Sequence, residues 1–177
     1  MKFLVGFVVA VSGALAFGEA PAIQPADALA KLAFMQGEWS GKQNFDTGGG
    51  PAMVGDATDR VELGIANKFL CETLSTTLPG RKPTDTRHFI SFDKSTQKYT
   101  AWWFNDTAYR PKALTGDLTG NKLVLLSDPS EPGPVLRATY ENPSADTLTY
   151  QVEMKNGDTW TRLFITTYTK RAAAAKQ

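Results

Sequence analysis

The sequence contains a single histidine and a single cysteine, and these are the first side chains to consider for catalysis. His88 is the one residue that titrates near neutral pH, so it is the candidate for proton transfer at a catalytic site. The alternative is a histidine that only forms hydrogen bonds within its strand. Cys71 could form a nucleophile–base pair with His88, but its neighbours Phe69 and Leu70 favour a packed, buried thiol.

Metal and carboxylate chemistry have little support in the sequence. One His and one Cys cannot supply a four-ligand structural zinc site, nor can one Cys form a disulfide within the chain. Asp56 and Asp59 lie at the start of an expected strand beside Arg60, and we expect both carboxylates to face solvent. Neither paired-carboxylate catalysis nor a metal site is therefore predicted.

Arginines in the middle of expected strands are candidate anchors for an acidic ligand, because a guanidinium can bind a carboxylate through two hydrogen bonds. Arg162 shares a strand face with Phe164 and Tyr168 if side chains alternate regularly along the strand. Arg137 is the second candidate. The alternative is an outward Arg162 that pairs with an acid such as Glu153.

Aromatic residues supply the expected apolar part of a binding site. Trp102 and Trp103 are adjacent, so they point to opposite faces of their strand and one of them should face inward. Tyr150 and Phe164 are further candidates for contact with a small hydrophobic or amphipathic ligand. The alternative is a solid core of rings. A closed barrel of about ten strands is wider than side chains fill, which favours a cavity.

These residues are carried by an all-β pattern that begins near residue 37. Strands are expected at 38–45, 57–65, 69–78, 87–93, 98–105, 111–117, 121–127, 135–141, 147–155 and 159–170. Asn156-Gly157 favours a tight type I′ turn between the last two. An antiparallel meander of this length is expected to form a closed or nearly closed barrel, because closure removes exposed edges. A short helix is predicted over residues 25–35, where apolar residues follow helical spacing.

The N-terminus has the pattern of a cleaved signal peptide. Lys2 precedes an apolar run that ends at Ala14-Leu15-Ala16, with an alternative end at Ala20. The run is too short to span a membrane, which needs about 20 apolar residues. We therefore expect a secreted or periplasmic protein without a membrane span. The predicted organisation is a signal peptide at 1–16, an N-terminal segment at 17–36, a β-barrel domain at 37–171 and a frayed tail at 172–177.

The charge is nearly balanced. The chain has 19 Lys and Arg against 18 Asp and Glu, a formal net charge of +1, and cleavage after Ala16 would remove Lys2 and bring it to zero. A nucleic-acid partner is not expected, because such proteins carry a concentrated basic surface. The oligomeric state is left open.

The start of the barrel resembles a known class. Gly37-Glu38-Trp39, preceded by a short helix, is similar to the opening of lipocalin-like (calycin) barrels, in which the tryptophan closes one end. In those barrels a basic side chain from the end of the last strand covers the ring. The resemblance gives that place to Lys170 and Arg171.

The hairpin Phe89–Asp106 resembles that of an uncharacterised bacterial family with this architecture, domain of unknown function 1579, and the likeness extends over about residues 29–171. It implies a fold and no activity. Nitrobindin-type barrels bind haem through a histidine near their C-terminal strands. The segment Trp160–Lys170 contains no histidine, so we expect neither haem nor another cofactor.

Three functional hypotheses follow from the sequence. The first is a secreted lipocalin-like barrel that binds a small hydrophobic or amphipathic molecule without catalysis. The second is an enzyme with a site in the barrel lumen around His88. The third is a protein-interaction module of the cell envelope with a filled core.

Overall fold

One short helix and ten antiparallel strands form the molecule. The computed structural model describes residues 22–46 and 50–172, so the predicted signal peptide and residues 173–177 of the predicted tail lie outside the described residues. The elements are α1 (Pro25–Ala30), a 3₁₀ turn (Ala33–Met35), β1 (Gly37–Phe45), β2 (Met53–Gly64), β3 (Phe69–Thr77), β4 (Thr84–Asp93), β5 (Lys98–Asn105), β6 (Lys112–Thr119), β7 (Lys122–Ser127), β8 (Leu136–Ser144), β9 (Thr147–Asn156) and β10 (Thr159–Lys170). The predicted single helix is thus two short helical pieces.

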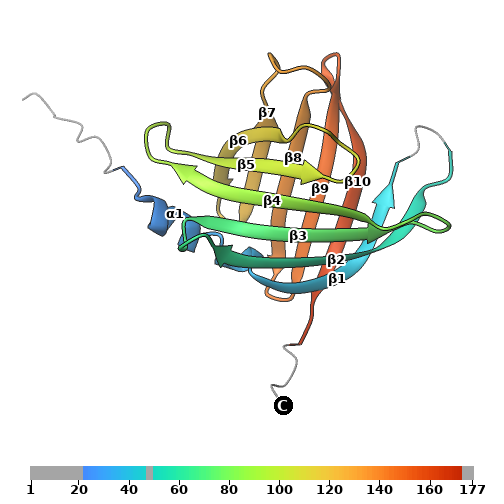
Figure 1. The fold of residues 1–177 in the computed structure, drawn as a ribbon, viewed down its shortest axis with the longest axis horizontal. Helices are drawn as coiled ribbons and strands as arrows, with labels where there is room; N and C mark the ends of the chain where they lie inside the picture. Colours follow the sequence, from blue (N-terminus) through green and yellow to red (C-terminus); the bar gives the residue numbers. More distant parts are fainter. Residues whose placement is uncertain (1–21, 47–49, 173–177) are drawn as a thin grey trace, which may run out of the picture.

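The strands close into one barrel in which each pairs with its neighbours in sequence and β1 pairs with β10 (Figure 1). This confirms the predicted fold. The turn at Asn156-Gly157 also forms as expected, because Asn156 pairs with Thr159 and Gly157 has a φ of 59°, which glycine adopts without strain.

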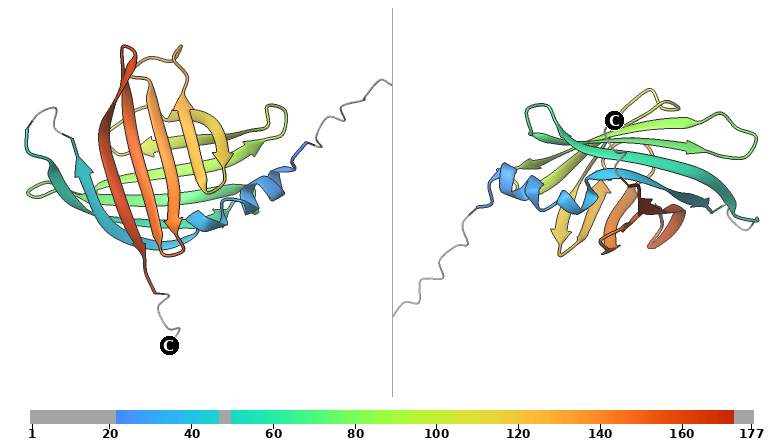
Figure 2. Two further views of the ribbon diagram at one scale, coloured as in Figure 1. Left: turned by 180° about the vertical axis from the view of Figure 1, so that it is seen from behind. Right: turned by 90° about the horizontal axis from the view of Figure 1, so that it is seen from below.

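The end of the barrel beside α1 is closed by apolar side chains (Figures 1 and 2). Trp39 is fully buried there and its Nε1–H donates to the Met35 carbonyl oxygen at 2.8 Å. Lys170 Nζ lies 5.3 Å from the centroid of the Trp39 ring. Gly37 makes this approach possible, since its φ is +138° and a Cβ there would lie 3.0 Å from Lys170 Cε. Arg171 is exposed, and its backbone N–H donates to the Glu38 carbonyl oxygen.

A β-bulge in β10 changes which side chains face inward. Arg162 pairs with Glu153 of β9, whereas Phe164 pairs with the next residue, Val152, so Leu163 is an extra residue in the strand. The bulge reverses the alternation that the sequence suggested. Arg162 therefore lies on the outer face and Phe164 on the inner one.

No helix among residues 22–46 and 50–172 is both long enough and apolar enough to cross a membrane.

Candidate functional site

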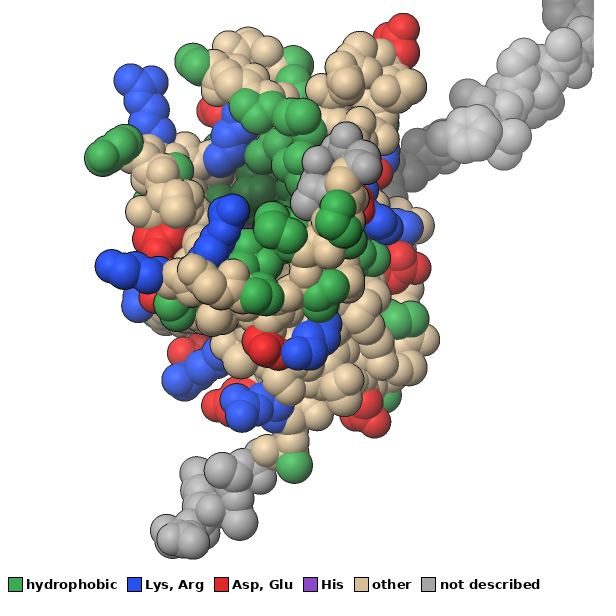
Figure 3. All heavy atoms as spheres, turned by 90° about the vertical axis from the view of Figure 1, so that its right-hand side faces the viewer, with side chains coloured by type: hydrophobic (Ala, Val, Ile, Leu, Met, Phe, Trp, Pro, Cys, Tyr) green, Lys and Arg blue, Asp and Glu red, His purple; other side chains and the backbone are tan. Residues whose placement is uncertain are grey.

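A cavity of about 420 Å³ occupies the end of the barrel opposite α1. Eighteen side chains line it: Gln43, Phe45, Leu74, Thr76, Leu78, Arg81, Lys82, Thr84, Thr86, His88, Trp103, Asn105, Thr107, Leu136, Tyr150, Val152, Leu163 and Phe164. Figure 3 shows this end as a hollow with hydrophobic side chains inside and Lys and Arg side chains around it. Because α1 and Trp39 close the other end, the cavity has its opening here.

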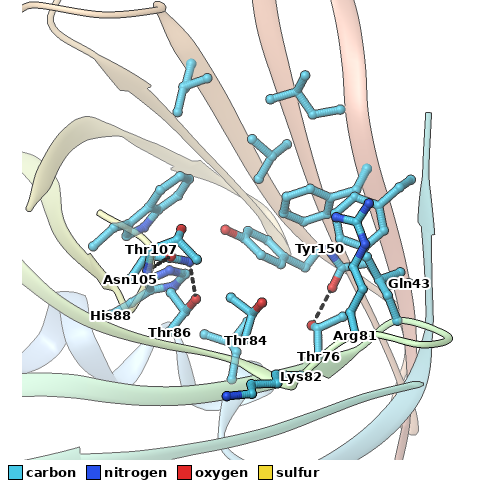
Figure 4. A pocket seen from close by; sticks show the side chains of 18 residues that line it. Gln43, Thr76, Arg81, Lys82, Thr84, Thr86, His88, Asn105, Thr107 and Tyr150 are labelled. Atoms are coloured by element: carbon cyan, nitrogen blue, oxygen red, sulfur yellow. Dashed lines mark hydrogen bonds between the residues drawn. The ribbon is translucent and has the colours of Figure 1, made fainter. Parts of the chain in front are cut away.

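One wall of the cavity is polar (Figure 4). Thr84, Thr86 and His88 are alternate residues of β4, so all three face inward. On the neighbouring strand, Asn105 donates through Nδ2 to Thr86 Oγ1 at 2.8 Å. The wall thus presents hydroxyl, amide and imidazole groups in a line from the opening to the inner end.

The opposite wall is apolar. It is formed by Leu136 of β8, Tyr150 and Val152 of β9, and Leu163 and Phe164 of β10. The Tyr150 and Phe164 rings meet edge to face, with centroids 5.5 Å apart. A ligand in this cavity would contact hydrocarbon on one side and hydrogen-bonding groups on the other.

A buried polar network lies behind the inner end of the cavity. His88 Nδ1 is 2.6 Å from Glu72 Oε2 and 2.9 Å from the Tyr140 hydroxyl, and that hydroxyl donates to Glu72 Oε2 at 2.7 Å. Asp59 of β2 is 3% exposed and interacts with Glu72 of β3. These four side chains come from four strands but share the inner face of the barrel.

Burial shifts the pKa of each ionisable group in the network. It raises the pKa of Glu72 to about 7, although hydrogen bonds from Tyr140 and Asp59 oppose the rise. It lowers the pKa of His88 to about 3, so the imidazole is neutral at physiological pH. The pKa of Asp59 lies well above its usual range because of burial and the neighbouring charge of Glu72. The network can therefore hold and exchange protons near neutrality.

Two cations lie at the opening. Arg81 and Lys82 belong to the β3–β4 connection, line the cavity and are exposed. Among the ion pairs of residues 22–46 and 50–172, neither cation has an acidic partner within 4.0 Å. They are available to an anionic group at the mouth of the cavity.

Of the aromatic residues predicted from the sequence, Trp103, Tyr150 and Phe164 line the cavity. Trp103 is thus the inward member of its pair. Trp102 packs against Phe69 instead, with ring centroids 6.1 Å apart, and does not line the cavity.

The two predicted arginine anchors do not reach the lumen. Arg162 Nε is 2.6 Å from Asp46 Oδ2, and the bulge in β10 places this pair on the outer surface. Arg137 Nε is 2.6 Å from Glu153 Oε2, and its guanidinium lies 4.4 Å above the Trp160 ring. The prediction that Arg162 points inward is therefore wrong, because it assumed regular alternation through Leu163.

Two further expectations are corrected. Cys71 is only partly buried, and because it neighbours Glu72 it points to the opposite face of β3 from the network, away from His88. This geometry excludes a Cys71–His88 pair. Asp59 was expected in solvent but is buried, whereas Asp56 is exposed and pairs with Lys42.

The sequence analysis missed Glu72, Tyr140 and the role of Asp59. A signal was present, because Asp59 lies between Ala57 and Val61, and Glu72 lies between Leu70 and Leu74. In each strand an acid therefore occupies a period-two apolar face. Among the described residues, no three His, Cys, Asp or Glu side chains converge as ligands for a metal ion.

Comparison with known proteins places this barrel in a family. The barrel is similar to the crystal structure of Rv2717c from M. tuberculosis, with a TM-score of 0.63, 15% identity, and coverage of 84% of this chain and 100% of that chain. It is also similar to the S-type phycobiliprotein lyase CPES from Guillardia theta, with a TM-score of 0.59, 7% identity, and coverage of 83% and 94%. These likenesses establish the fold alone.

No curated protein sequence matches the chain. One family model, described as "Protein of unknown function (DUF1579)", matches residues 24–171, which include every strand of the barrel. The chain therefore belongs to the DUF1579 family.

Proposed function

We propose that this barrel binds a small amphipathic molecule in its cavity. The observation that carries the proposal is a cavity of about 420 Å³ with one polar wall, one apolar wall and a single open end. This volume lies within the range of known ligand pockets, which is about 300–1,000 Å³. A filled core, as in the third hypothesis, does not agree with such a cavity. The likeness to a phycobiliprotein lyase supports a role in ligand handling.

The ligand is inferred to carry an anionic group at its outer end. Arg81 and Lys82 face the opening and are solvated, so a carboxylate placed between them gains attraction without the cost of leaving water completely. This replaces the buried arginine anchor that the sequence suggested. The hydrocarbon part of the ligand would then lie against Tyr150, Val152 and Phe164.

The protein is proposed to act outside the cytoplasm, because residues 1–16 have the composition of a signal peptide. Mass spectrometry of the protein from the envelope fraction of its host should find a chain that begins at residue 17 or 21. An intact N-terminus would contradict this.

Binding can be tested by calorimetry with 2-naphthoic acid, a rigid acid with a flat apolar body. Val152→Phe adds a ring to the apolar wall and should abolish binding. Val124→Phe is the matched control, because Val124 lies in an outer groove between Lys122 and Arg137 and should leave binding unchanged. If naphthoic acids do not bind the wild-type protein, or if both variants bind like wild type, the cavity is not the site.

A further inference from the structure

The network behind the cavity is costly for a protein interior. Asp59, Glu72, His88 and Tyr140 are at most 3% exposed. Within the described chain, both Asp59 oxygens and Glu72 Oε1 have no hydrogen-bond donor unless one carboxyl group keeps a proton. Buried polar groups without full partners destabilise a fold, and apolar residues at these positions would avoid the cost. Their position beside the cavity points to a role in binding.

The hydrogen bonds fix which nitrogen of His88 carries the proton. Nδ1 and the Tyr140 hydroxyl both lie within 2.7 Å of Glu72 Oε2. When Glu72 is ionised it can only accept, so Nδ1–H donates to it, as does the hydroxyl. Since burial keeps the imidazole neutral, Nε2 then has no proton and offers a lone pair.

His88 Nε2 is also the polar atom of this ring that faces the cavity. His88 lines the cavity, and both printed hydrogen bonds of its ring are made by Nδ1. Within the described part of the chain, Nε2 is not among the buried polar atoms that lack a partner, so the cavity gives it access.

We propose that the inner end of the cavity is a hydrogen-bonding subsite, in which His88 Nε2 accepts a hydrogen bond from a hydroxyl or N–H group of the ligand. The inference rests on the proposed function and narrows it to a class of ligands. These are flat or elongated molecules with an anion at the outer end, near Arg81 and Lys82, and an O–H or N–H donor at the inner end.

The acceptor is held ready for such a group. The His88 ring stacks on Trp103, with centroids 4.8 Å apart and planes at 23°, and meets the edge of Tyr150 at 5.9 Å. Together with the Glu72 and Tyr140 hydrogen bonds, these contacts fix the ring on every described side except the cavity. A ligand therefore does not have to order the imidazole on binding, which increases affinity. Glu72 is the positioning residue, because it fixes the tautomer.

The test uses three rigid probes: 6-hydroxy-2-naphthoic acid, 6-methoxy-2-naphthoic acid and the parent 2-naphthoic acid. All place a carboxylate at one end, but only the first carries a donor at the other. In calorimetry at pH 8 the hydroxy acid should bind about tenfold more tightly than either of the others, as expected for one added hydrogen bond. Thr84→Val, a change near the opening, should keep this preference.

Because the sequence has one histidine, nitrogen NMR of protein labelled with ¹⁵N-histidine reports His88 alone. At pH 8 the free protein should show protonated Nδ1 and unprotonated Nε2. The hydroxy acid should move the Nε2 signal, whereas the methoxy acid, which has a similar ring system, should move it much less. His88→Phe should remove the preference for the hydroxy acid. If that variant does not fold, the wild-type spectrum still decides.

A proton on Nε2 at pH 8, an Nε2 signal that does not respond to the hydroxy acid, or equal affinities for the hydroxy and methoxy acids would overturn the subsite. The proposed function would survive these results, since it fails only if none of the three acids binds in the cavity.

Discussion

Glu72 and His88 should affect the pH dependence of stability in opposite directions. The pKa of Glu72 rises from 4.5 to about 7 on folding, so its contribution to stability is present below pH 4.5 and lost as the pH rises through 7. The pKa of His88 falls from 6.5 to about 3, so its contribution is present above pH 6.5 and lost as the pH falls through 3.

Each pKa unit is equivalent to about 1.4 kcal/mol. Between pH 4.5 and 6.5 the Glu72 contribution should fall by about 2 kcal/mol while the His88 contribution rises by about 2 kcal/mol, so the two nearly cancel in the wild type. Glu72→Gln removes the falling contribution. Its free energy of unfolding should therefore rise across this interval by about 2 kcal/mol more than that of the wild type. For His88→Gln the difference should have the opposite sign.

Urea unfolding followed by tryptophan fluorescence at pH 4.5, 5.5 and 6.5 measures these differences. Glu62→Gln is the control, because Glu62 is an exposed acid on β2. Each variant is compared with the wild type at the same pH, so groups common to both cancel. If Glu72→Gln and His88→Gln both follow the wild-type profile, the two groups do not titrate as buried side chains, and the reasoning about the network is refuted.

Three further predictions concern residues outside the network. Trp39→Ala should reduce the free energy of unfolding in urea by about 3–5 kcal/mol, because it removes a buried ring together with its contact to Lys170, and a wild-type transition would contradict its role in closing the barrel. Cys71 should react with a maleimide at pH 7 several-fold more slowly in the folded protein than in urea, since burial and the charge of Glu62 raise its pKa, and equal rates would contradict this. Arg162→Met should leave the calorimetric affinity for 2-naphthoic acid unchanged, because Arg162 pairs with Asp46 outside the lumen, and a large loss would return it to the binding site.

The fold could be predicted because its signals are local. Turn residues such as Asn156-Gly157 and period-two alternation act within about ten residues, and they located all ten strands. The strand starts were less certain, and β2 begins at Met53 rather than at residue 57. The bulge at Leu163 could not be predicted, because one extra residue leaves the composition of the strand unchanged but reverses every side chain on one side of it.

The site was predicted only in part because its contacts are not local. Trp103, Tyr150 and Phe164 were found from residue type and alternation. The partner of His88 is Glu72, 16 residues earlier, and Tyr140 lies 52 residues later. Register across β3, β4 and β8 brings them together, and no local pattern of residues determines that register.

The pairing of β1 with β10 has a consequence for how the protein is made. β1 ends at Phe45 and its partner begins at Thr159, so during synthesis the first strand must wait for nearly the whole chain before one of its edges is covered. At about 5–20 residues per second, this interval lasts several seconds. Over that time β1 and the newest strand both present open backbone groups that can pair with other chains. An incomplete chain that stops before Thr159 is therefore expected to aggregate. Protection of β1 by a chaperone, rather than the pairing of adjacent strands, would then limit the yield of folded protein.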